Sequence, residues 1–343
     1  MTVQSSRSVA VFLVLLMSST AYAQKTDVVT LANGDRITGE VKKLQRGQLE
    51  FSTDDAGTLE LEWDKLTSLL TNRMVEVVLT DGRRFLGTLG PAPDARSISV
   101  ETSGGSVLLP ALEVTEINPI GKSFWSKLDG SIDVGYSYTR SSGIGQFNLN
   151  TDTVFRRPAS SIRLSTSFTS TQTEDDQGDD DRGSIEASLL RYPWQKWFVT
   201  VLGRVETNES LGLELRSQTG AAAGPVITQG NRGHLAVGGG MVVNREQGVS
   251  SEPTVNFEGL FLLTTSFYTY DRPKTNVDIT FQYYPSLSDF GRQRVQLDSS
   301  FKREIWKDFF ATINVYDTFD SNPPEAGADR NDVGIVFALG WTF

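Results

Sequence analysis

The last eleven residues of the chain, 333–343, alternate between large apolar side chains and mostly small ones. The odd positions carry Val, Ile, Phe, Leu, Trp and Phe, and the even positions carry Gly, Val, Ala, Gly and Thr. A period of two over this length predicts a β-strand with one apolar face, long enough to cross a bilayer at a tilt. Backbone polar groups survive in lipid only in helices or closed barrels, so such a strand must belong to a barrel that closes on itself.

The same alternation recurs along the chain from residue 124 onward. It predicts twelve strands, at 127–140, 144–157, 160–174, 183–193, 196–208, 211–227, 232–245, 253–270, 275–285, 293–304, 309–319 and 332–343. Tight connections such as 157–158 and 272–273 alternate with longer polar ones, as expected for periplasmic turns and outer loops. We therefore predict an all-β chain whose residues 124–343 form a 12-stranded antiparallel transmembrane β-barrel. Trp341 and Phe343 end this barrel like the C-terminal insertion signal that the barrel-assembly machinery reads.

The N-terminus has the three parts of a secretory signal peptide in order. Arg7 is the positive residue, 9–17 is an apolar run, and 21–23 is a small-x-small cleavage site. Residues 1–23 are therefore predicted to be removed after export. Together with the barrel, this predicts a protein of the bacterial outer membrane, in contact with its lipid and lipopolysaccharide, whose N-terminal part lies in the periplasm.

Residues 24–123 differ in composition from residues 124–343. They hold three aromatic residues, whereas 124–343 hold 29. They also contain an internal repeat, because 29–41 recurs as 77–89 at an offset of 48 residues. Asn33-Gly34 and Asp81-Gly82 match at this offset, and each is a strong hairpin signal. We predict two small SH3-like or Sm-like β-barrels, at 24–72 and 73–123.

Composition excludes several classes of function. Cysteine is absent and there is one histidine, so thiolate and His-cluster metal sites are excluded, and no cofactor is indicated. The net charge of −10 gives no electrostatic footprint for nucleic acid. His234 is the one candidate imidazole base, but no His-x-Ser motif accompanies it. We interpret it as a rim histidine and predict that the chain is not an enzyme.

Two groups of charged residues remain as candidate binding residues. The first is expected to face the barrel lumen, where it could form either a plug network or a selectivity ring: Asp133, Arg163, Glu214, Arg216, Asp278, Asp298 and Lys302. The second lies in an acidic loop: Glu174, Asp175, Asp176, Asp179, Asp180 and Asp181. This spacing does not match an EF-hand. We interpret the loop as a solvated, self-repelling outer loop, and the alternative is Ca²⁺ or Mg²⁺ bridging to lipopolysaccharide.

Several short stretches of the predicted barrel resemble the YdiY-like family of outer-membrane proteins of unknown function, some of them described as salt-induced. They are Gly135-Tyr-Ser-Tyr138, Leu190-Arg-Tyr192, and Leu211-Gly-Leu-Glu-Leu-Arg216 followed by 220–224. The resemblance covers about 125–343, implies an outer-membrane barrel, and brings no catalytic or binding residues. The paired repeats at 28–119 are an addition to the simplest form of that family.

Polar lumen positions and barrel size make a small-solute or ion channel the leading hypothesis. The alternative is a structural protein with a blocked lumen, whose periplasmic modules bind an envelope protein or peptidoglycan. A lipid enzyme is disfavoured because His234 is isolated. Conductance separates the first two hypotheses, and loss of lipid hydrolysis in His234→Ala would reveal the third.

Overall fold

The structure is a computed structural model. It describes residues 25–94, 97–121, 127–139, 144–173, 180–208, 212–248, 252–271, 273–307, 309–324 and 329–341. The predicted signal peptide lies outside these ranges. In the described part of the chain, no helix is long and apolar enough to span a membrane.

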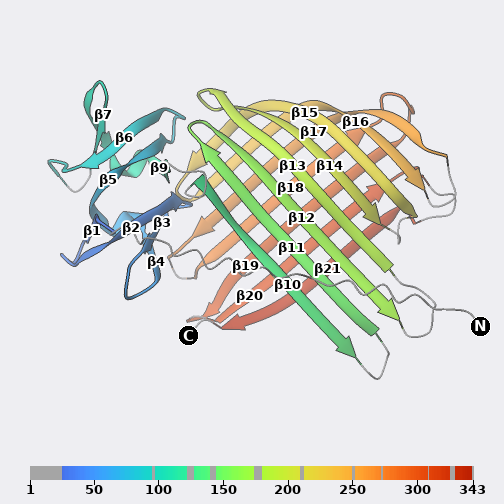
Figure 1. The fold of residues 1–343 in the computed structure, drawn as a ribbon, viewed down its shortest axis with the longest axis horizontal. Coiled ribbons are helices and arrows are strands. Elements are labelled where there is room, and N and C mark those ends of the chain that lie inside the picture. The colour runs from blue at the N-terminus through green and yellow to red at the C-terminus, as the bar shows by residue number, and fades with distance from the viewer. Residues whose placement is uncertain are drawn as a thin grey trace, which may run out of the picture.

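The C-terminal part is a 12-stranded antiparallel sheet in which each strand pairs with its neighbours in the chain (Figure 1). Its strands are β10 Leu128–Thr139, β11 Ile144–Arg157, β12 Ser160–Thr173, β13 Asp180–Trp194, β14 Trp197–Asn208, β15 Leu213–Gly230, β16 Gly233–Gly248, β17 Thr254–Thr269, β18 Thr275–Pro285, β19 Gln293–Trp306, β20 Phe309–Asp320 and β21 Asn331–Trp341. All twelve predicted strands are confirmed. Alternation was a reliable guide because each strand has two chemically different faces.

The outer face of this sheet is apolar. Residues of one parity expose large apolar side chains, and Ile132 on β10 and Phe337 on β21 are both 73% exposed. Other exposed members of this outer belt are Val134, Leu164, Ile185, Val201, Met241, Phe257, Phe261 and Leu339. An apolar area this extensive is typical of a surface that meets lipid or a partner rather than water.

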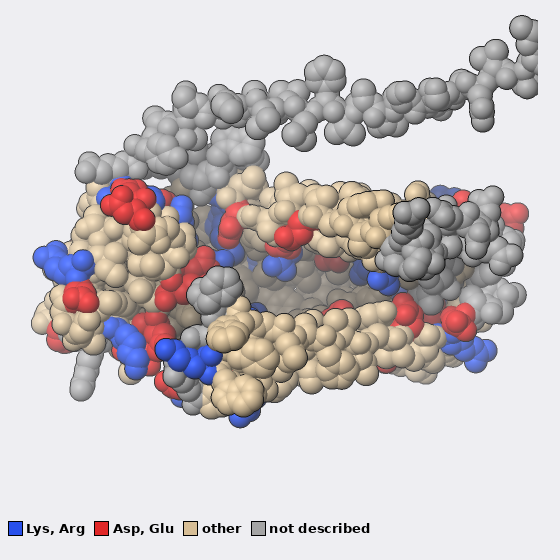
Figure 2. Space-filling model, turned by 90° about the horizontal axis from the view of Figure 1, so that it is seen from below, with Lys and Arg blue, Asp and Glu red and all other residues tan. Residues whose placement is uncertain are grey.

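The sheet curls into a barrel, but its two end strands do not meet. Among the described residues, β10 pairs only with β11 and β21 pairs only with β20. Figure 2, viewed from below, shows a long slot through which charged side chains are visible in a hollow interior. The expected closure therefore differs from the structure in one place, because β10 and β21 form no backbone hydrogen-bond ladder with each other in the described part of the chain.

The N-terminal domain, residues 25–121, packs against one end of the barrel (Figure 1). Its strands are β1 Asp27–Leu31, β2 Arg36–Gln45, β3 Gln48–Ser52, β4 Thr58–Glu62, β5 Leu66–Leu79, β6 Arg84–Gly90, β7 Ser97–Thr102, β8 Gly105–Pro110 and β9 Val114–Pro119, with 3₁₀ turns η1 Trp63–Lys65 and η2 Ala111–Glu113. Strand β1 pairs with β2 and β5, and β9 also pairs with β2 and β5. These four strands close a small barrel.

The internal repeat is confirmed by its hydrogen bonds. Ala32 N donates to Lys65 O at 2.8 Å, and Thr80 N donates to Glu113 O at 2.9 Å. The donor and the acceptor of the second bond each lie 48 residues after those of the first. The two hairpin glycines also match, with φ of 91° at Gly34 and 85° at Gly82. These positive φ values explain why glycine stands at both turns.

The two repeats nevertheless share one core. The structure shows one closed four-strand barrel with added strands in place of two separate small barrels. The expected boundary at 72/73 falls inside β5, which crosses from one repeat to the other. Buried Val29, Leu44 and Phe51 pack in the same cluster as Val77 and Ile117. A unit of about 45 residues buries little apolar surface alone, so fusing two repeats enlarges the core.

Candidate functional site: the polar interior of the barrel

A buried ionic cluster crosses the barrel interior at the end remote from the N-terminal domain. Arg216 on β15 binds Glu206 on β14 (Nη1 to Oε1, 2.8 Å) and Glu246 on β16 (Nη2 to Oε2, 2.9 Å). Its Nη2 also lies 3.7 Å from Asp320 Oδ2 on β20. Strands β15 and β20 are not neighbours in the sheet, so this contact must cross the interior.

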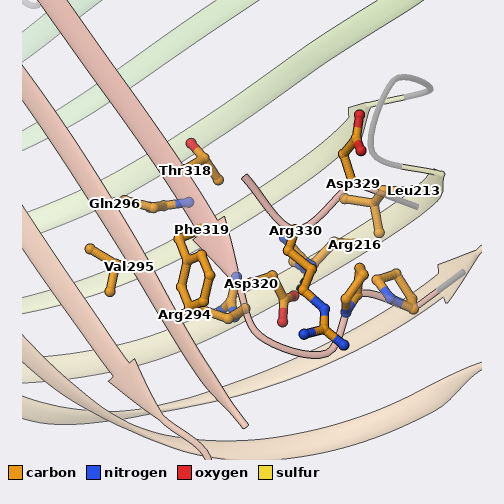
Figure 3. A pocket seen from close by; sticks show the side chains of 12 residues that line it. Leu213, Arg216, Arg294, Val295, Gln296, Thr318, Phe319, Asp320, Asp329 and Arg330 are labelled. Carbon is orange, nitrogen blue, oxygen red and sulfur yellow. Dashed lines mark ion pairs between the residues drawn. The ribbon is translucent and has the colours of Figure 1, made fainter. Parts of the chain in front are cut away.

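Arg292, just before β19, joins the same cluster from the other side. It forms an ion pair with Glu246, and its Nη2 lies 2.6 Å from Asp320 Oδ2. Asn256 Nδ2 donates to Glu246 Oε1 at 2.8 Å. Figure 3 shows Arg216, Arg294 and Asp320 around a small pocket bordered by Asp329 and Arg330.

The charges of this cluster balance. Its cationic members are Arg204, Arg216, Arg292 and Arg294, and its anionic members are Glu206, Glu246, Glu258 and Asp320. Arg294 holds Glu258 with two bonds, at 2.8 Å from Nε and 2.5 Å from Nη2, and stacks over Tyr284 at 4.8 Å. Ionised groups are this deeply buried in proteins only when they are paired, as they are here. The cluster thus links strands from β14 to β20 inside the barrel.

The interior stays open and polar between this cluster and the wall formed by β11–β13. A cavity of 220 Å³ at the remote end is lined by Ser167, Thr169 and Ser184 together with Arg182, Arg204 and Glu206. Ser167 Oγ donates to Asn150 Oδ1 at 2.9 Å, and Thr169 Oγ1 donates to Asn148 Oδ1 at 3.1 Å. The inner wall of these strands therefore offers hydroxyl and amide groups to water.

The N-terminal domain reaches the other end of the interior through Arg46. This residue has φ of 57° at the tip of the β2–β3 turn, next to Gly47. Its guanidinium binds Asp278 on β18 at two points, 2.7 Å and 3.1 Å, and lies 5.6 Å from the ring centroid of Tyr268. Asp278 also accepts a hydrogen bond from Ser266 Oγ at 2.6 Å.

Two turns and one strand of the barrel also hold the domain in place. Glu76 Oε1 accepts a hydrogen bond from Ala159 N at 2.8 Å, in the turn between β11 and β12. Arg84 stacks over Tyr192 on β13 at 4.4 Å. Asn231, between β15 and β16, donates from Nδ2 to Val114 O at 2.9 Å. These contacts reach from the turn between β11 and β12 to the turn between β15 and β16, so the domain covers part of the barrel opening.

The predicted lumen residues occupy several environments. Arg216 lies in the ionic cluster and Asp278 binds Arg46. Arg163 Nε lies 3.2 Å from Asp152 Oδ2, and Lys302 Nζ lies 4.7 Å from the ring centroid of Phe310. The other three are exposed: Asp133 on β10 lies opposite Asn150, and Asp298 on β19 lies opposite Thr280. Glu214, at the start of β15, accepts a hydrogen bond from Gln247 Nε2 at 2.9 Å.

The acidic-loop prediction falls mostly outside the described residues. Glu174, Asp175, Asp176 and Asp179 are not described, while Asp180 and Asp181 begin β13. In the described ranges, no three His, Cys, Asp or Glu side chains come together as a metal site. Trp341 ends β21 with its side chain exposed, Phe343 is outside the described residues, and His234 is half-buried on β16 opposite Ser266.

Sequence reasoning missed most of the cluster and the docking arginine. Arg294 shares its parity on β19 with Asp298 and Lys302, so the same periodicity argument extends to it. Arg46 carried no such signal, because its partner lies 232 residues away in the chain.

A protein-family model described as "Protein of unknown function, DUF481" matches residues 132–343, which span the barrel. The chain belongs to the DUF481 family. The resemblance to YdiY-like outer-membrane barrels is consistent with this match. No curated protein and no solved structure matches the chain. The DUF481 match ends short of the N-terminal domain, so the docking domain and Arg46 are features outside the matched region.

Proposed function

We propose that this DUF481 protein is an outer-membrane β-barrel that passes small polar solutes along the β11–β13 side of its lumen. The open polar wall carries this proposal. Ser167 is exposed on the inner face and lines an open cavity, whereas strands β14 to β20 carry the paired charges of the ionic cluster. A passage confined to part of a twelve-stranded barrel would be narrow, between the filled lumen of eight strands and the open channel of porins.

The outer belt supports a place in the outer membrane, with lipid and lipopolysaccharide against residues such as Ile132 and Phe337. In hydrocarbon the free edges of β10 and β21 would leave backbone groups without partners, so we expect them to pair there. The N-terminal domain would lie in the periplasm and cover part of the inner opening. Recognition of the C-terminal strand by the assembly machinery belongs to the same proposal.

The experiment is single-channel conductance of the refolded full-length mature chain in a planar bilayer. Ser167→Trp places a large side chain in the polar wall and should lower the step size. Thr166→Trp is the matched control, because its neighbouring position points to the outer face and should leave the step size unchanged. A folded, heat-modifiable barrel that shows no conductance steps would reject the channel proposal.

A second function is favoured by the cluster that crosses the lumen. Its ion pairs join strands on opposite sides of the interior, as a structural plug would, through Arg216, Arg292, Glu246 and Asp320. In that case the barrel anchors the N-terminal domain, which would bind a periplasmic protein or peptidoglycan. If the folded protein shows no conductance in planar bilayers and the intact protein binds peptidoglycan, this second function would be supported over the first.

A further inference from the structure

A cavity of 290 Å³ lies where the N-terminal domain meets the open polar wall. We call it the junction cavity. The domain lines it with Arg84, Glu116 and Asn118, and the barrel lines it with Arg156, Arg163 and Ser161. It sits at the domain-facing ends of β11 and β12. Strand β12 runs on to the cavity at the remote end, which Ser167 lines, and Ser167 bonds Asn150 on β11. The junction cavity is thus an entrance to the proposed passage.

Guanidinium groups reach the junction cavity from three strands. Arg84 Nη1 lies 3.2 Å from Glu76 Oε2, Arg163 Nε lies 3.2 Å from Asp152 Oδ2, and Arg156 Nη2 lies 3.9 Å from Asp129 Oδ2. Each of these contacts engages one nitrogen of a group that carries five N–H donors. Arg163 is also well exposed, with 59% of its side chain accessible. The arginines are therefore held in place by carboxylates and still present donors to the cavity.

The carboxylate within the lining is already bonded. Glu116 Oε1 accepts from Gln229 Nε2 at 2.8 Å, and its Oε2 accepts from Asn118 Nδ2 at 3.2 Å. The partner acids Glu76, Asp129 and Asp152 offset the arginine charges, so the long-range field is small. Recognition in this cavity would depend on direct, charge-assisted hydrogen bonds, for which guanidinium matches the geometry of carboxylate and phosphate oxygens.

We propose that the junction cavity binds the oxyanion of a small organic acid or phosphate compound, held chiefly by Arg156 and Arg163. The inference names a solute class for the proposed passage and rests on that function for its physiological meaning. The cavity volume fits a small molecule and not a polymer. Ser161 and Ser188 supply hydroxyl groups for the rest of the ligand.

The test is isothermal titration calorimetry on the full-length mature protein refolded in detergent, with inorganic phosphate and citrate as separate probes. We expect saturable binding of at least one probe. The double variant Arg156→Gln/Arg163→Gln should bind it at least tenfold more weakly, and the single variant Arg163→Gln should show an intermediate loss. Arg84 is left intact because it also holds the domain against Tyr192. The matched control is Arg232→Gln, a rim arginine that pairs with Asp271 outside this cavity.

The outcomes separate this proposal from the channel proposal. Binding of phosphate alone or of citrate alone supports the site and fixes its ligand class. Absence of saturable binding of both probes to the folded wild type would overturn it, as would equal affinity in wild type and double variant. Heat-modifiable migration and circular dichroism check that each variant is folded. Binding without conductance would reject only the passage, and conductance without binding would reject only this site.

Discussion

Arg46 and Asp278 join the N-terminal domain to the inner wall of the barrel through two hydrogen bonds, of 2.7 Å and 3.1 Å. Both side chains are about one-third exposed, at 38% and 33%, so solvent screens this pair. We expect Arg46→Ala to weaken docking by about 1 kcal/mol. Hydrogen exchange at the β2–β3 turn should then accelerate by about fivefold. The control is Arg36→Ala, at an exposed hairpin residue of the same domain, and equal exchange in both variants would contradict a docking role for Arg46.

The ionic cluster predicts a large difference between two glutamates near the same end of the barrel. Glu246 is buried and holds both Arg216 and Arg292, whereas Glu214 is exposed. Glu246→Gln leaves two buried cations short of a partner, so we expect a loss of about 3 kcal/mol in the free energy of unfolding. Glu214→Gln should change it by less than about 0.5 kcal/mol. Urea unfolding, followed by the heat-modifiable migration of the barrel in gel electrophoresis, measures the free energy of unfolding of both variants. Similar losses in the two variants would show that the cluster is not a stabilising unit.

Periodicity was enough to place the barrel strands. The predicted first and last residues of β11 and β18 agree with the structure. Successive residues of these strands point alternately to the apolar outer face and to the interior, and this alternation marks where each strand begins and ends. The ionic cluster was harder to foresee. Arg216 and Asp320 meet across the lumen, and which strands face each other depends on how the sheet curls, which local pattern does not encode.

The N-terminal repeat shows a second limit of sequence reasoning. The offset of 48 residues correctly placed both hairpins, since each needs a glycine with positive φ. It did not reveal that β9 pairs with β2, because that contact joins Leu44 to Ile117 across the two repeats. Long-range pairing of this kind is set by burial of the shared core rather than by either repeat alone.

Glu40 predicts a pH dependence of stability in the N-terminal domain. Burial would raise the pKa of its carboxyl, but Arg73 and Lys42 outweigh that effect and hold the pKa below its ordinary value of 4.5. The ionised form therefore stabilises the fold above pH 4.5, and this contribution is lost as the pH falls through the lowered pKa. We expect the stability difference between wild type and Glu40→Gln to be largest near neutral pH and to shrink on acidification. Denaturant titrations across this range measure it, and a difference independent of pH would contradict the assignment.

Alanine variants of the two hairpin glycines, Gly34 and Gly82, distinguish the effect of backbone strain from the effect of contact between the domain and the barrel. Both Gly34 and Gly82 have positive φ, so replacing either with alanine should cost about 1–2 kcal/mol in local strain. A Cβ at position 34 would meet nothing within 4 Å, whereas a Cβ at position 82 would lie 2.7 Å from Lys196 N in the turn between β13 and β14. Gly82→Ala must therefore also push the hairpin away from the barrel. We expect faster hydrogen exchange at Lys196 in Gly82→Ala only, and an equal response in Gly34→Ala would mean that strain within the domain, and not contact with the barrel, controls the docked state.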